Sequence, residues 1–198
     1  MDPLKHEAPG CLVYINGYPG VGKLTIATHL CTLLGSSRAL LIDNHQLIDP
    51  VTIPRSAGEA YYAERRRIRQ AALENYVLAP QMQNKIIVFT DSQVVGPVGP
   101  GVAAEFEAAA RQSGRAFLPV YITCLEEENW RRLGSEERGK GGKGKLMDVD
   151  ILKGIIRDME LFRFADVPGL SIDATTRKPE DAAGEILLAI KDIVGLGE

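Results

Sequence analysis

Apolar residues along the chain follow two alternating patterns. Short continuous apolar runs, typical of strands buried on both faces, occur at residues 11–15, 39–42, 86–89, 116–123 and 170–172. Between them, apolar residues recur every three or four positions, the spacing of a helix with one buried face. We expect helices over 24–34, 56–79, 102–112, 126–133, 148–164 and 179–194. The second of these should begin at a capping box formed by Ser56 and Glu59.

This alternation of strands and helices predicts the fold class. Successive strands joined through helices form right-handed crossovers, which build a parallel sheet covered by helices on both faces. Ligands of such α/β folds bind at the carboxyl ends of the strands. We find no internal repeat and no linker, so we expect a single domain over 1–198.

Composition and charge limit the kinds of partner that we expect for this protein. The 198 residues carry a net charge of −3, which favours neither nucleic acid nor an anionic membrane. No apolar run approaches the roughly 18 residues of a membrane span, and the N-terminus lacks the apolar core of a signal peptide. Cys11, Cys31 and Cys124 follow no metal-ligand spacing, so we interpret them as core residues of a cytoplasmic protein.

The stretch GYPGVGKLT, residues 17–25, lies between the first strand and the first helix. It fits the phosphate-binding pattern G-x-x-x-x-G-K (Walker A), whose glycines let backbone N–H groups approach an anion while the lysine adds a positive charge. The alternative is a glycine turn that only links a strand to a helix. As the nucleotide-contacting residues we expect Gly17, Tyr18, Pro19, Gly20, Val21, Gly22, Lys23, Leu24 and Thr25.

Leu24 occupies the position at which most such loops present a hydroxyl to Mg²⁺, and the hydroxyl arrives one residue later, at Thr25. The pattern G-x-P-G-x-G-K-x-T resembles the adenylate-kinase branch of P-loop kinases. That resemblance implies a nucleoside monophosphate kinase-like P-loop NTPase fold, with a five-stranded parallel sheet in the order 2-3-1-4-5 and a mobile lid. It also implies Mg²⁺ held largely through water and the nucleotide, with Thr25 on a phosphate.

A second candidate group is LIDNHQLID, where Asp43 ends the second strand. A carboxylate at that place can accept the proton of an acceptor hydroxyl. The pattern resembles the kinases of shikimate, gluconate and chloramphenicol, which carry Asp there, often as Asp-x-Asp. Here His45 replaces the second Asp. We expect Asp43 and His45 to contact the acceptor, with either as the base; a capping aspartate and a loop histidine are the alternatives.

The third strand ends in IIVFTD, a possible Walker B element. Its Asp91 would order the water shell of Mg²⁺ together with Thr25 and face the acceptor, unless it is a purely structural residue. Adenylate-kinase relatives continue with Gly and Arg, which grip a nucleoside monophosphate. Here Ser92 and Gln93 follow, which disfavours that acceptor.

Arginines flank a glycine-rich segment that resembles the lid of P-loop kinases, over about 134–146. We expect Arg138 to close over the phosphates, with Arg131 or Arg132 second, unless these are solvated charges. Arg177 and Lys178, after the fifth strand, are candidates near the nucleotide base. The NKxD motif of guanine-selective proteins is absent, which favours ATP.

Arg65, Arg66, Arg67 and Arg69 form the densest basic run, on the long second helix. A solvated face is the default interpretation; the alternatives are a site for an anionic acceptor or for RNA.

The sequence therefore predicts an ATP- and Mg²⁺-dependent phosphotransferase that acts on a hydroxyl of a small molecule. Lys23, Asp43 and Arg138 are its candidate catalytic residues. An RNA or nucleoside kinase, and a nucleotide-binding NTPase or regulatory protein without transfer activity, are the alternatives. The sequence determines neither the acceptor nor the oligomeric state.

Overall fold

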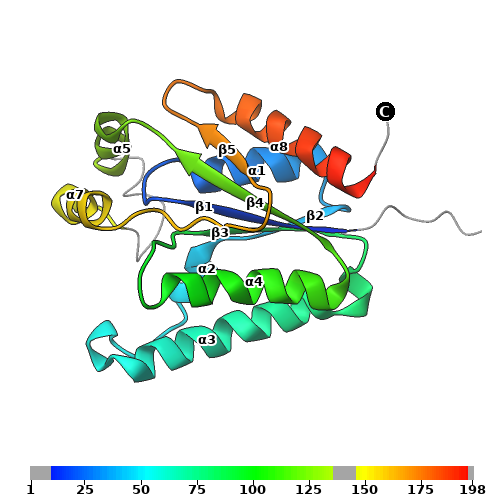
Figure 1. Cartoon of the computed structure of the whole chain (residues 1–198), viewed down its shortest axis with the longest axis horizontal. Coiled ribbons are helices and arrows are strands. Elements are labelled where there is room, and N and C mark those ends of the chain that lie inside the picture. The colour runs from blue at the N-terminus through cyan, green and yellow to red at the C-terminus, as the bar shows by residue number, and fades with distance from the viewer. Residues whose placement is uncertain (1–9, 136–145, 196–198) are drawn as a thin grey trace, which may run out of the picture.

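The computed structural model describes residues 10–135 and 146–195. Its centre is a five-stranded sheet in the order β2-β3-β1-β4-β5, in which all neighbouring strands run parallel, so the sequence prediction of the fold is confirmed (Figure 1). The strands are β1 (Cys11–Gly17), β2 (Ala39–Ile42), β3 (Ile86–Asp91), β4 (Ala116–Thr123) and β5 (Leu170–Asp173).

The helices lie on both faces of the sheet. They are α1 (Lys23–Leu34), α2 (Asn44–Ile48), α3 (Glu59–Leu73), α4 (Gly99–Ser113), α5 (Glu126–Leu133), α7 (Val149–Asp158) and α8 (Pro179–Val194). The pair α1 and α8 covers one face, and α3 and α4 cover the other (Figure 1). Helices α5 and α7 lie beyond the carboxyl ends of the strands, where ligands of parallel sheets bind.

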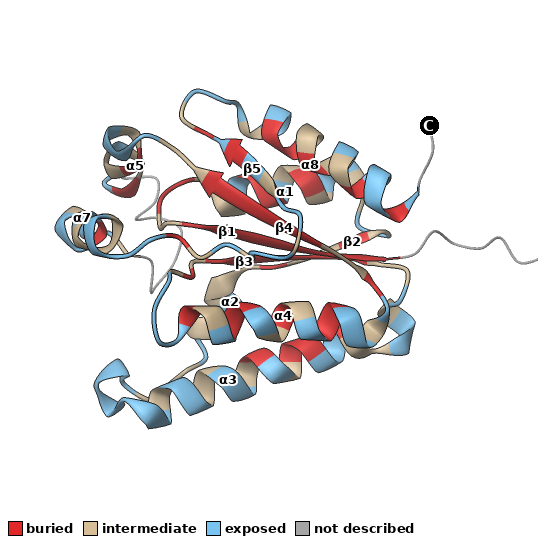
Figure 2. Ribbon diagram, in the orientation of Figure 1, coloured by how far each residue is buried: buried red, intermediate tan, exposed pale blue. Residues whose placement is uncertain are grey.

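Alternation along the strands divides the core into two clusters. In β1, Val13 and Ile15 face the α1 and α8 side, whereas Leu12 and Tyr14 face the α3 and α4 side. Every residue of β1 is buried, because this strand lies in the middle of the sheet (Figure 2). Side chains at the carboxyl end of each strand therefore also point to one defined face.

Two helix boundaries differ from the sequence prediction. The capping box at Ser56 is wrong, since Ser56 lies in a 3₁₀ turn and Gly58 precedes α3 without a side-chain cap. The helix expected over 148–164 ends at Asp158. Residues 159–164 run extended because their backbone bonds go to other segments: Val95 N–H donates to the Glu160 carbonyl at 2.7 Å, and Phe162 N–H donates to that of Gln93 at 3.1 Å.

The long helical segment before Pro80 also changes character at its end. Regular α-helix stops at Leu73 and continues as a π-helical turn, Glu74–Leu78. Arg115 is buried and donates hydrogen bonds to the carbonyls of Val77, Met82 and Lys85, which fixes this turn against the start of β4. Across the described ranges, no helix is long and apolar enough to cross a membrane.

Candidate active site

The phosphate-binding candidate forms a loop between β1 and α1. Gly20 and Gly22 have φ of 93° and 101°, which side-chain-bearing residues rarely adopt. Gly22 is the N-cap residue of α1 and has no side chain to cap the helix. The first N–H groups of α1 therefore have no capping side chain and are directed out of the helix end. An end of this kind, with the positive pole of the helix dipole, suits a phosphate group.

Two glycines of the loop are also required by close neighbours. A Cβ on Gly17 would come within 2.6 Å of the Ile122 carbonyl oxygen, and one on Gly20 within 2.5 Å of Asn129 Oδ1. Real Cβ atoms do not approach other atoms so closely. The path of the loop is therefore restricted by β4 at Gly17 and by α5 at Gly20.

Lys23 curls back over this loop. Its Nζ donates to the carbonyls of Gly17 at 2.7 Å and Tyr18 at 2.8 Å, which holds the ammonium group beside the loop. Leu24 is half-buried, whereas Thr25 is exposed on the first turn of α1. The hydroxyl of Thr25 is therefore accessible at the start of α1, at the position after Leu24.

Asp43 and Thr90 meet at the ends of β2 and β3. Thr90 Oγ1 donates to Asp43 Oδ1 at 2.5 Å and accepts from the Asn44 N–H at 3.1 Å. The Asp43 N–H donates to Gln46 Oε1 at 2.8 Å, so Asp43 also begins α2. Because Ile86 and Val88 face α1, Thr90 faces the same side, and its hydrogen bond holds Asp43 at the carboxyl end of β2.

His45 is the second residue of α2. Its Nδ1 is 3.3 Å from Asp49 Oδ1, a pair that fixes the orientation of the ring. His45 is half-buried and Asp49 is exposed. The structure thus brings both base candidates, Asp43 and His45, to the same short segment after β2.

Asp91 lies in a different setting. It is 3 % exposed and belongs to the strand positions that face α3 and α4. Its Oδ1 accepts from Ser92 N–H and Gln93 Nε2, both at 2.8 Å, and its Oδ2 accepts from the Tyr14 hydroxyl at 3.1 Å. These donors compensate for burial of the carboxylate. Asp91 is thus on the face of the sheet opposite to α1 and Thr25.

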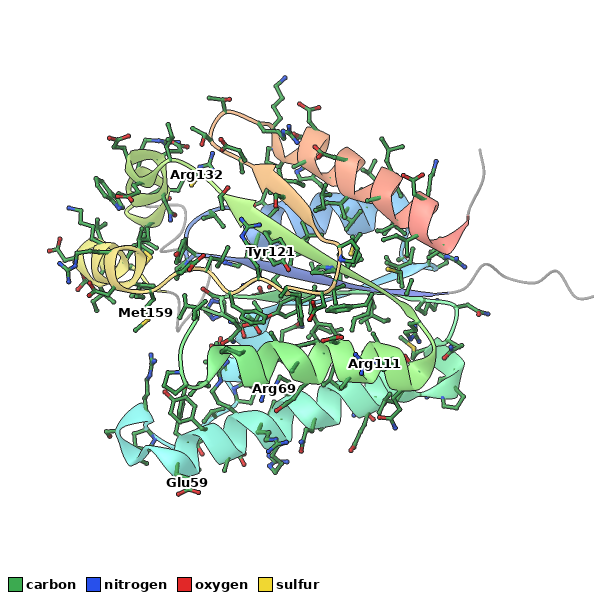
Figure 3. The ribbon with its side chains drawn as sticks, viewed as in Figure 1. Glu59, Arg69, Arg111, Tyr121, Arg132 and Met159 are labelled. Atoms are coloured by element: carbon green, nitrogen blue, oxygen red, sulfur yellow. The ribbon has the colours of Figure 1, made fainter. Side chains whose placement is uncertain are left out.

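The two arginines of α5 have unequal roles. Arg131 is exposed and forms two 2.7 Å hydrogen bonds with Glu128. Arg132 instead reaches inward: its Nη1 donates to the Val21 carbonyl at 3.2 Å, and its Nη2 donates to those of Ala174 at 2.8 Å and Thr175 at 3.1 Å. Figure 3 labels Arg132 at this end of the sheet. Arg132 therefore joins the phosphate-binding loop to the segment after β5.

Glu128 orients both guanidinium groups. The hydrogen bond from Arg131 lowers the pKa of Glu128 to about 2 against the opposing effect of burial, and the hydrogen bond from Arg132 adds to the lowering. The carboxylate is therefore charged at neutral pH and holds Arg132 through a 2.6 Å bond to Nε.

The segment after β5 is tied to the start of α5. Thr175 donates twice to Asp173 Oδ1, through N–H at 2.8 Å and Oγ1 at 2.5 Å, and these bonds lower the pKa of Asp173. Leu125 N–H donates to Thr175 Oγ1 at 2.9 Å. Arg177 pairs with Glu185, and Lys178 directly precedes α8. Arg138 and residues 136–145 of the expected lid lie outside the described residues.

A groove of about 470 Å³ opens between α3 and α4, next to the loop that follows β3. Arg69 lies in it, only 5 % exposed, and its Nε donates to Glu105 Oε2 at 2.7 Å (Figure 3). Gln93, the residue that donates to Asp91, also lines this groove. The groove therefore lies at the α3 and α4 side of the sheet, beside the loop that follows β3 at its carboxyl end.

Comparison with solved structures identifies the fold. The gluconokinase of Sinorhizobium meliloti 1021 matches with a TM-score of 0.61 at 14 % identity, covering 96 % of each chain. The fold is that of P-loop kinases. The Mycobacterium tuberculosis APS kinase CysC, solved with AMPPNP and APS, matches with a TM-score of 0.60 at 17 % identity, over 92 % of this chain and 98 % of the other.

Kti12 of Chaetomium thermophilum, solved with ADP-AlF3, matches with a TM-score of 0.63 at 18 % identity, over 92 % of this chain and 98 % of the other. No protein-family model and no curated protein matches the chain. The likeness to P-loop kinases is therefore one of fold, and the roles of individual residues rest on the geometry of this chain.

Sequence reasoning did not single out Thr90 or Glu105. A signal for Thr90 was present, because a period of two from Ile86 places it on the face of α1. No comparable signal marks Glu105, since its partner Arg69 is 36 residues away. Pairs between separate helices depend on packing that periodicity does not specify.

Proposed function

We propose that this chain is an ATP-dependent phosphotransferase that transfers the γ-phosphoryl group to a hydroxyl of a small molecule. The observation that carries the proposal is Asp43, which Thr90 holds through a 2.5 Å hydrogen bond at the carboxyl end of β2, the end of the sheet at which the glycine-rich loop also follows β1. A carboxylate there can take the proton of an attacking hydroxyl. Simple nucleotide binding would not need it.

The other parts of the site have matching roles in this proposal. Lys23 and the N-terminus of α1 bind the β- and γ-phosphates. Arg132 holds the loop around Val21 and the segment after β5 together, which keeps the two ends of a nucleotide site in register. Mg²⁺ would accompany the phosphates and neutralise their charge, with Thr25 as the protein hydroxyl available to it.

Asp91 is assigned a supporting role. Its three hydrogen bonds and its position on the opposite face favour a contribution to the groove between α3 and α4 through Gln93. Arg138 remains the candidate from the lid that would close over the transferring group.

The test is ATP consumption against a library of hydroxyl-bearing metabolites, with product mass measured. We expect an acceptor-dependent gain of one phosphoryl mass that falls at least about 100-fold in Lys23→Met and Asp43→Asn. Asp192→Asn, a change of the same kind on the exposed face of α8, should retain wild-type activity. Tight ATP binding without any phosphorylated product would refute transfer and favour a regulatory nucleotide-binding protein.

His45→Gln separates the two base candidates. If Asp43 is the base, His45→Gln should raise KM and leave kcat within a few-fold of wild type, whereas Asp43→Asn should lower kcat. The reverse pattern would assign the base to His45, which Asp49 orients.

A further inference from the structure

The groove between α3 and α4 has a charged end and an apolar wall. Arg65, Arg66 and Arg69 from α3 line it together with Glu105 from α4. Three guanidinium groups against one carboxylate leave two net positive charges. A groove of about 470 Å³ has the size of a small-molecule site.

The charged end is organised by Glu105. Its Oε2 accepts from Arg69 Nε at 2.7 Å, and its Oε1 lies 3.2 Å from Arg66 Nε. One carboxylate thus holds two guanidinium groups side by side, which limits the ordering that a ligand would have to impose. Arg65 adds a third group, whose Cζ lies 6.0 Å from the centre of the Tyr61 ring.

The remaining wall is apolar. Tyr62 contributes an aromatic ring from α3, and Pro97, Val98 and Val102 contribute aliphatic surface from the other side. An apolar wall is removed from water when the ring or hydrocarbon of a ligand packs against it, which favours binding. The same wall offers few hydrogen-bond partners to the many hydroxyls of a sugar chain. Gln93 supplies an amide at the end nearest β3.

We infer that this groove binds an anionic acceptor, one with a carboxylate or phosphate on Arg65 and Arg66 and an apolar or aromatic body against Tyr62 and Val98. That the ligand is an acceptor rests on the proposed function. The selectivity of the groove for anions can be measured without phosphoryl transfer. Arginine forks match the geometry of such anions. The arginine run on α3 is thereby divided: Arg67 pairs with Glu64 at 2.8 Å and does not line the groove.

The experiment measures binding of matched fragment pairs, aromatic and alicyclic hydroxy-carboxylates against their primary amides, by ligand-observed NMR. Saturating Mg-ADP is present, so that the phosphate-binding loop does not take the carboxylates. We expect the carboxylates to bind about tenfold or more tightly than the amides. This preference should vanish in Arg65→Gln/Arg66→Gln.

The matched control is Arg67→Gln/Arg111→Gln. It removes two charges from the same two helices, at exposed residues that pair with Glu64 and Glu107 outside the groove. It should keep the carboxylate preference of the wild type. Thermal unfolding of both double variants checks that each is folded.

Equal affinity of acids and amides, an identical response of the two double variants, or no fragment binding would overturn the inference. Salt-dependent binding of a single-stranded RNA oligonucleotide that is lost in Arg65→Gln/Arg66→Gln, without a carboxylate preference, would assign the arginines to RNA and overturn it as well. Mg-ADP binding is measured separately, through the fluorescence of Trp130, the single tryptophan. If the wild-type protein does not bind Mg-ADP, that result counts against the proposed function and not against the groove.

Discussion

Replacing Gly20 by alanine tests whether α5 shapes the phosphate-binding loop. At φ of 93°, a Cβ on this residue costs about 1–2 kcal/mol through local backbone strain. The same Cβ would lie 2.5 Å from Asn129 Oδ1 and 3.3 Å from the Asn129 carbonyl oxygen, so the Asn129 side chain must move and the backbone of α5 must give by a few tenths of an ångström. Overpacking of this kind costs about 1–3 kcal/mol. We expect Gly20→Ala to destabilise the protein by about 3 kcal/mol in total.

Two companion variants separate the two contributions. Gly114 has φ of 68° with nothing near its Cβ position, so Gly114→Ala should show the backbone cost alone, about 1 kcal/mol. In the background of Asn129→Ala, the side-chain clash at residue 20 is removed, and the further cost of Gly20→Ala should fall towards that of Gly114→Ala. The double-mutant cycle then gives the clash as the difference.

The assays are urea unfolding, which gives the free energy of unfolding, and thermal unfolding, which gives Tm, both followed by circular dichroism, with ATP affinity measured on the same samples. For a chain of this length, about 3 kcal/mol corresponds to a fall in Tm of about 6–12 °C. ATP binding should weaken in Gly20→Ala and stay unchanged in Gly114→Ala. If Gly20→Ala costs no more than Gly114→Ala, or if Asn129→Ala gives no relief, α5 does not define the loop.

Three further predictions follow from single contacts. Thr90→Val should lower the free energy of unfolding by about 1–3 kcal/mol and lower kcat about tenfold, because Asp43 loses its 2.5 Å hydrogen bond. Thr90→Ser should retain the stability and the kcat of the wild type. Equal kcat in the Val and Ser variants would contradict this prediction. Because the pKa of Glu128 falls from 4.5 to about 2 on folding, its stabilising contribution is present above pH 4.5 and is lost as pH falls towards 2. Unfolding of wild type should therefore depend more steeply on pH in that window than unfolding of Glu128→Gln, and parallel curves would refute the pairing. Burial raises the pKa of Cys31 to about 11 from 9.0, so at pH 8 iodoacetamide should alkylate it about 100-fold more slowly in the folded chain than in urea, as measured by mass spectrometry; comparable rates would contradict the burial.

Local patterns were sufficient to predict the strands, the order of the helices and the place of the glycine-rich loop between β1 and α1. A short continuous apolar run between turn residues is typical of a strand that is buried on both faces of a sheet. The loop from Gly17 to Thr25 is equally local, because its glycines, its lysine and the helix end that follows are neighbours in sequence. The sheet order came from the resemblance to P-loop kinases carried by that loop.

Tertiary structure decided which candidate side chains meet. Asp91 looked like a metal-ordering residue after β3, but the two-residue period of the strand turns it towards Tyr14 and away from α1, and presents Thr90 to Asp43 instead. The extended path of residues 159–164 likewise depends on partners far away in the sequence.

The arginine run on α3 shows the same division between sequence and structure. Its residues are adjacent in sequence, yet Glu105 on another helix selects Arg66 and Arg69 for the groove, while Arg67 is directed to Glu64. Sequence alone determined that this protein has a parallel sheet with a glycine-rich loop between its first strand and first helix. The packing of α3 against α4 determined the groove beside it, because the positions of charges on two separate helices are fixed only when the helices meet.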